Sequence, residues 1–132
     1  MVDIPANVME KMADPATTKV LVTASESGRP HAIVCGSIVA PSPDKVIVGE
    51  VLMKRAAANL AANPKAAFLV SSGMESYEII VRNPVRIAEG PILEQMNENL
   101  AKINLKAAAV WAFDVCAVYN EGANPQAGTQ IA

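Results

Sequence analysis

The chain has 132 residues, of which 52% are hydrophobic and 18% are charged, and its formal net charge at neutral pH is −2. This length and composition favour one soluble domain with a single core, and they exclude both a disordered protein and a membrane-spanning one. The charges are spread over both halves without a basic block, so we expect no nucleic-acid partner and no membrane partner.

The first part of the chain predicts a short helix followed by three strands. Pro5 to Ala13 places apolar residues at helical spacing behind a proline suited to a first turn. Strands are expected over Lys19 to Ala24, His31 to Val39 and Lys45 to Gly49, because turns rich in Ser, Gly and Pro separate these apolar runs. Their order along the chain predicts an antiparallel meander.

A second helix and two strands are expected next. Lys54 to Ala62 is rich in alanine and leucine and ends at Asn63-Pro64, which is typical of a short helix and its stop signal. Strands follow over Lys65 to Ser71 and Tyr77 to Ala88. Because Asn83-Pro84 interrupts the second of these strands, we predict a bulge there.

The last part of the chain predicts a helix, a long strand and a tail. Gly90-Pro91 opens the helix, in which apolar residues recur at steps of four and three: Ile92, Met96, Leu100 and Ile103. Ala109 to Tyr119 is predicted as a strand with one face in the core and the other at an interface, and the apolar excess of the chain also favours an oligomer. Asn120 to Ala132 is predicted to be mobile or draped over a partner subunit.

These elements predict a mainly β protein with one domain over residues 1–120 and a C-terminal tail over residues 121–132. Six antiparallel strands are expected to close a Greek-key-like barrel with short flanking helices. Cys35 and Cys116 lie apart in apolar runs, so we expect neither a disulfide nor, with one histidine, a metal site. Met1 to Lys19 contains no long apolar stretch, so no secretory signal is predicted and a cytoplasmic protein is expected.

The most informative segment lies between Gly49 and Pro64, where a strand ends, a short loop turns and a helix begins at Lys54-Arg55. A helix N-terminus presents unpaired N–H groups and a partial positive charge, so cations there are unfavourable by up to about 1 kcal/mol. A bound phosphate reverses that sign, because both the amides and the side chains attract it. The segment therefore predicts a phosphate site, with two solvated cations at the start of an exposed helix as the alternative.

The run from Arg55 to Pro64, with Asn59-Leu60 and Asn63-Pro64 ahead of an apolar strand, resembles the FMN-binding split-barrel family. This family includes the pyridoxamine-phosphate oxidases and small FMN-binding proteins. Gly28-Arg29-Pro30-His31 and the order of the elements are also similar to the family, so the resemblance covers most of the chain. It implies FMN as the cofactor, held near the subunit interface of a homodimer.

The resemblance also implies a role for individual residues. Arg55, with Lys54 beside it, would bind the FMN phosphate, and Asn59 would support the loop. Two departures from the family are Ala56, where a hydroxyl residue is common, and Glu50, which adds a negative charge near the site.

Two strands are implied to form the walls of the isoalloxazine site. Two of the wall residues are glycines, which suit a close approach of the backbone to a flat ring. One wall is the end of the third strand, with Val48, Gly49 and Glu50. The opposite wall is the second strand, with Cys35, Gly36 and Ser37.

The function implied by the resemblance is a flavin-dependent oxidoreductase, in which the flavin carries the electrons and no catalytic residue of the protein is predicted. Pyridoxamine-phosphate oxidase activity itself is not expected, because no Arg follows Arg86 and no His follows His31 to hold that substrate. Two alternatives stay open. In the first, the barrel has lost flavin binding and serves as a dimeric binding or structural protein. In the second, the same groove holds a deazaflavin or a haem.

Overall fold

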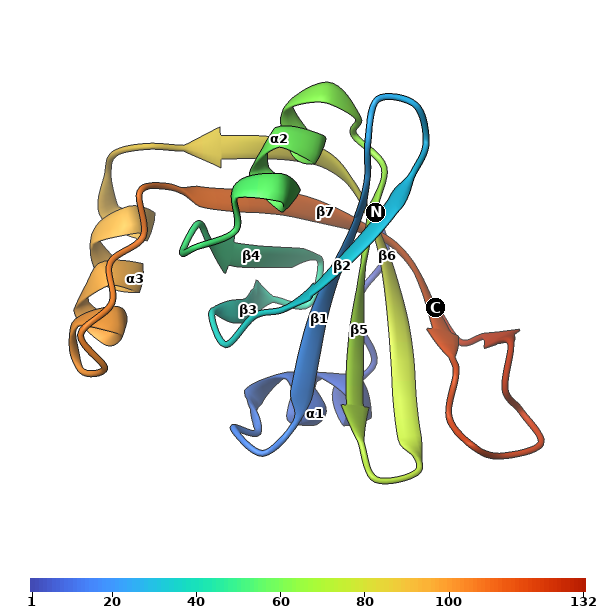
Figure 1. Ribbon diagram of the computed structural model, residues 1–132. Helices are drawn as coiled ribbons and strands as arrows, with labels where there is room; N and C mark the ends of the chain where they lie inside the picture. The colour runs from blue at the N-terminus through green and yellow to red at the C-terminus, as the bar shows by residue number, and fades with distance from the viewer.

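One antiparallel sheet, curled upon itself, contains every strand of the chain (Figure 1). The computed structural model describes residues 1–132. In chain order, the elements are α1 (Ala6–Ala13), β1 (Thr18–Ala24), β2 (Pro30–Val34), β3 (Ile38–Ser42), β4 (Lys45–Gly49), α2 (Lys54–Ala62), β5 (Ala66–Ser72), β6 (Glu75–Ile87), α3 (Pro91–Ala101), β7 (Val110–Asn120) and β8 (Thr129–Gln130). The predicted mainly β architecture with short flanking helices is thereby confirmed.

The barrel is split between β2 and β3. The strands lie in the order β2-β1-β5-β6-β7-β4-β3, and β8 pairs with β7. β2 and β3 follow each other in the chain and yet form the two edges of the sheet, so no ladder joins them. The predicted second strand is therefore two strands joined by residues 35–37, and the sheet has eight strands where six were predicted.

The predicted bulge in β6 is confirmed. The register between β6 and β7 shifts between Arg82 and Val85, and Asn83 has a left-handed φ of 55°. Asparagine adopts this conformation more readily than most residues because its short side chain bonds locally to the backbone. Beyond the bulge, β6 continues to Ile87 and α3 follows it in the chain.

The C-terminal segment lies on its own barrel. Thr129 pairs with Asn120, and the Val118 N–H donates to the Ala132 carbonyl at 2.9 Å. Gly122 is buried in the turn, where a Cβ would lie 2.7 Å from the Met74 carbonyl oxygen, so only glycine fits without a shift of the backbone. The segment predicted to be mobile or draped over a partner is thus paired with β7 of the same chain.

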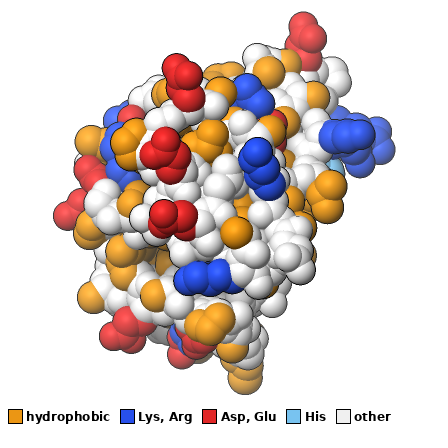
Figure 2. Space-filling view, turned by 90° about the vertical axis from the view of Figure 1, so that its left-hand side faces the viewer, with side chains coloured by type: hydrophobic (Ala, Val, Ile, Leu, Met, Phe, Trp, Pro, Cys, Tyr) orange, Lys and Arg blue, Asp and Glu red, His pale blue; other side chains and the backbone are white.

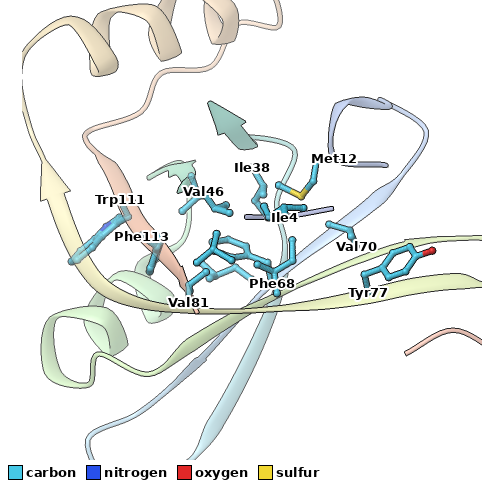
Figure 3. Packing of buried hydrophobic residues seen from close by; sticks show 14 of the residues in the cluster. Ile4, Met12, Ile38, Val46, Phe68, Val70, Tyr77, Val81, Trp111 and Phe113 are labelled. Carbon is cyan, nitrogen blue, oxygen red and sulfur yellow. The ribbon is translucent and has the colours of Figure 1, made fainter. Parts of the chain in front are cut away.

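The core fills the inside of the curled sheet. Phe68 and Phe113 are fully buried and meet edge to face, with ring centroids 5.3 Å apart and planes at 84° (Figure 3). Trp111 lies two residues before Phe113 on β7 and is also buried, because alternate residues of a strand point to the same face. One end of the sheet is closed by α1, through Val8 and Met12.

The other two helices lie near the split edge. α2 packs against β1 and β2 and buries Ala56 and Leu60. α3 stands apart from the main core and buries Met96 and Leu100 in a small cluster with Ala107 and other apolar residues (Figure 1). None of the helices has the length and apolar character needed to cross a bilayer.

Candidate functional site

A groove follows the split edge of the barrel from the start of α2 to α3. It consists of three adjoining hollows, which we call the cationic hollow, the central hollow and the α3 hollow, of about 250, 250 and 550 Å³. The first two share Ile33 and Leu52, and the last two share Gly36, Ser37, Leu100 and Ile103. Together they form one surface, which we call the edge groove.

The cationic hollow lies at the N-terminus of α2 and is lined by His31, Lys54 and Arg55 among others. No side chain caps this helix, and no acidic residue lies in its first turn. The first N–H bonded in the turn is that of Ala57, which donates to the Met53 carbonyl at 2.9 Å, so the N–H groups of residues 54–56 have no partner within the helix. In Figure 2, which views the left-hand side of Figure 1, cationic side chains lie beside the single histidine at the right-hand edge.

The central hollow is lined by a strained and exposed leucine. Leu52 has a φ of 53° and is 86% exposed, between the half-buried Val51 and the buried Met53. A left-handed conformation costs a non-glycine residue roughly 1–2 kcal/mol, and such strain concentrates at ligand-binding sites. Leu52 is a site residue that sequence reasoning missed, because the letters of this loop carry no signal of its φ.

Residues 35–37 form the floor of the central hollow. Nothing lies within 4 Å of a Cβ added to Gly36, so the backbone there is open to a ligand. The Ser37 hydroxyl donates to the Gly49 carbonyl at 3.2 Å and ties this connection to the end of β4. Burial raises the pKa of the Cys35 thiol, which therefore stays protonated and weakly nucleophilic at neutral pH.

Comparison with solved structures identifies the architecture. HupZ of Group A Streptococcus superposes with a TM-score of 0.79 at 16% identity, covering 95% of this chain and 99% of that chain. An FMN-binding protein from Syntrophomonas wolfei superposes with a TM-score of 0.73 at 16% identity, covering 86% of each chain. The chain has the split-barrel fold.

Another split barrel of the same shape is HutZ, the heme storage protein from Vibrio cholerae, with a TM-score of 0.68 at 14% identity over 92% of this chain and 97% of that chain. No family model and no curated protein sequence matches the chain. At these identities the comparisons show the fold alone, so the ligand must be argued from the residues of the edge groove.

This split barrel places the two predicted phosphate-binding cations at the groove. Lys54 and Arg55 are exposed and make no ion pair with any acidic residue. Ala56, in contrast, is fully buried in the core, so position 56 faces the barrel interior. The missing hydroxyl at this position therefore removes no contact from the groove.

Asn59 supports the helix against β1. Its side-chain amide donates to the Thr23 hydroxyl at 3.0 Å, and the Asn63 amide likewise donates to the Ser25 carbonyl at 3.0 Å. The two asparagines thus fix α2 to β1 and to the turn after it. Asn59 lines none of the three hollows, so its contribution to the site is the placement of the helix.

Val48 and Gly49, at the end of β4, line none of the three hollows. Val48 is fully buried in the barrel core, because alternate residues of a strand point to opposite faces. A Cβ on Gly49 would lie 3.2 Å from the Cγ and Sδ atoms of Met96, so this glycine allows α3 to pack closely, where we expected it to face a flat ring. The central hollow is lined instead by Val51 and Leu52, which follow β4 in the chain.

Glu50 also turns away from the edge groove. Its carboxylate accepts hydrogen bonds from Arg86 Nε at 3.1 Å, Arg86 Nη2 at 2.9 Å and Trp111 Nε1 at 2.8 Å. The hydrogen bond with Arg86 is the main reason why the pKa of Glu50 lies below its ordinary value. Because Arg86 on β6 neutralises the Glu50 carboxylate and Trp111 on β7 donates a hydrogen bond to it, this negative charge does not oppose an anion in the cationic hollow.

Proposed function

We propose that the protein binds FMN in the edge groove and acts as a flavin-dependent oxidoreductase. The observation that carries the proposal is the uncapped start of α2, where Lys54 and Arg55 flank free backbone N–H groups next to an apolar slot. FMN has a dianionic phosphate at one end and a flat aromatic ring at the other. The two adjoining hollows match this division of charge.

The residues fit the two ends of FMN separately. The phosphate would accept charge-assisted hydrogen bonds from Arg55 and from the backbone N–H groups of the first turn of α2. These groups make the start of α2 more stable with a bound anion than without one. The ring would lie over Gly36 between Ile33 and Leu52, which leave an apolar slot with an open floor. Bound flavin supplies the electron transfer, while these residues hold and orient it.

A titration with FMN tests the proposal directly. We expect the purified protein to quench the fluorescence of added FMN and to melt at a higher temperature, because a ligand at a hundred times its Kd adds about 2.7 kcal/mol to the stability of the folded state. Riboflavin, which lacks the phosphate, is the matched control and should bind more weakly. A protein that melts at the same temperature with and without FMN contradicts the proposal.

A haem in the same groove is the second candidate, and the position of His31 favours it. The only histidine of the chain lines the cationic hollow beside Lys54 and Arg55, which would pair with the propionates of a haem while the imidazole bound its iron. The similarity to the heme storage protein HutZ supports this candidate as well. Titration with hemin should then give a Soret band that shifts in His31→Ala. If the groove holds FMN and not haem, we expect hemin to give no such His31-dependent band.

We further propose that the protein is a homodimer that associates through the outer face of β1, β5 and β6. Val22, Ala67 and Ile80 are half-buried there and line a shallow hollow of about 460 Å³. In a two-fold dimer the same patch of both subunits meets, so the patch must be complementary to itself. An apolar patch on a sheet face meets this condition, because its copy is also apolar.

The charge-introducing variant Ile80→Arg tests this interface. Because a two-fold axis brings each new arginine close to its own copy, we expect at least a tenfold weaker dimer, or about 1.4 kcal/mol. Sedimentation velocity measures the change. Val85→Arg is the control, since Val85 is an exposed residue of the same strand outside the hollow. A wild-type protein that sediments as a monomer contradicts the interface.

A further inference from the structure

The α3 hollow has a lining without charge. It lies between α3 and the strands β3 and β4, and its volume of about 550 Å³ is in the range of small-molecule sites. None of its 12 lining residues carries an ionisable side chain. Glu94, Glu98 and Lys102 belong to the same helix region, but they follow one another at four-residue steps along a separate face. Charge is therefore kept away from the hollow.

The apolar stripe of α3 is longer than the protein surface that covers it. Met96 and Leu100, in the middle of the stripe, are buried against Ala107 and Val110. Ile92 and Ile103, at its two ends, are 45% and 63% exposed, and both line the hollow. Large apolar side chains that border a hollow and stay exposed mark a surface that suits an apolar binding partner.

Two amide side chains add neutral hydrogen-bonding groups to this wall. Gln95 and Asn99 lie one turn apart on α3, and both line the hollow. Both residues are exposed. An amide offers both a donor and an acceptor, so the pair suits the hydroxyl or carbonyl group of an uncharged ligand.

The α3 hollow continues into the central hollow, where the flavin ring is proposed to lie. The two hollows share Gly36 and Ser37 on the barrel, Leu100 of α3 and Ile103 just after this helix. We infer that the α3 hollow binds the substrate of the protein, and that this substrate is a neutral, largely apolar molecule with a hydroxyl or carbonyl group. The inference rests on the proposed FMN site. An anionic substrate would lose its hydration without gaining a cation.

A matched pair of probes tests the charge preference. 2-Naphthol is neutral at pH 7, and naphthalene-2-sulfonate has the same two rings with a negative charge. Each probe is titrated by calorimetry into the FMN-loaded protein, and the flavin absorbance is recorded in parallel. We expect 2-naphthol to bind at least tenfold more tightly and to perturb the flavin absorption band. Equal or tighter binding of the sulfonate overturns the inference.

Variants place the probe in the hollow. Ile92→Asp should weaken 2-naphthol binding at least tenfold while FMN affinity stays unchanged, and Ile131→Asp is the control because Ile131 is 41% exposed and lines none of the hollows. Gln95→Glu adds a charge at an exposed position and preserves the test if Ile92→Asp does not fold. If Ile92→Asp changes the mass of the protein in solution and leaves 2-naphthol binding unaltered, a second copy covers the hollow and the inference fails.

The two proposals fail in different ways. A protein that takes up FMN and binds neither probe overturns the substrate inference and leaves the FMN site standing. A protein that takes up no FMN and still binds 2-naphthol at Ile92 overturns the FMN site and with it the substrate role, and leaves a neutral ligand site.

Discussion

Arg55→Ala is expected to weaken FMN binding about 10- to 150-fold, which corresponds to the roughly 1.5–3 kcal/mol that a hydrogen bond to a charged group contributes. Arg55 is exposed, lines the cationic hollow and forms no ion pair, so its removal takes nothing from the fold. The free energy of unfolding without ligand should therefore fall by no more than about 0.5 kcal/mol. Titration of flavin fluorescence measures the affinity.

Two controls separate a phosphate contact from a general effect of charge. Arg82→Ala removes an exposed arginine of β6 that lines none of the three hollows, so it should leave FMN affinity nearly unchanged. Riboflavin should bind wild-type protein and Arg55→Ala equally, because it has no phosphate to lose. Equal losses for FMN and riboflavin would instead place Arg55 against the ring.

The cationic end of the groove could be predicted from the sequence because its signal is local. A strand, a short loop and a helix that starts with Lys54-Arg55 are fixed by neighbouring residues, and the structure places both side chains at the hollow. The helices and most strands follow from hydrophobic periodicity in the same way. Long-range pairing is what the sequence did not reveal.

Register explains why the predicted wall residues at the end of β4 lie outside the three hollows. Which of two consecutive strand residues faces outwards depends on the partner strand, and Val48 faces the core while Gly49 faces Met96. The sequence predicts one strand from His31 to Val39, across the split at residues 35–37, because Cys35 and its neighbours are apolar. Only the whole sheet shows that β2 and β3 are opposite edges. Leu52 was missed because its positive φ is set by the loop on either side of it.

Glu50→Gln is expected to destabilise the fold by about 1–2 kcal/mol at neutral pH, because it removes the ion pair with Arg86. The loss is no larger because the partly exposed Arg86 keeps some of its hydration. The carboxylate ties the end of β4 to Arg86 on β6 and Trp111 on β7. Glutamine keeps the shape and one acceptor oxygen, so it removes the charge while it leaves the packing of Trp111 in place. Urea unfolding at pH 7 measures the change, and Glu26→Gln is the control, because Glu26 is exposed in the turn after β1 and forms no ion pair.

The pH dependence identifies the ionic part of this contribution. The pKa of Glu50 is lowered in the folded protein, chiefly by its hydrogen bond with Arg86, so the stabilisation is complete above the ordinary value of 4.5 and is lost as the pH falls through the lowered pKa. Wild type and Glu50→Gln should therefore differ at pH 7 and converge in acid. Asp114, whose pKa is lowered by Asn83 and Lys45, keeps a residual acid dependence in both proteins. A difference that is as large in acid as at pH 7 would mean that the carboxylate acts through its shape and not through its charge.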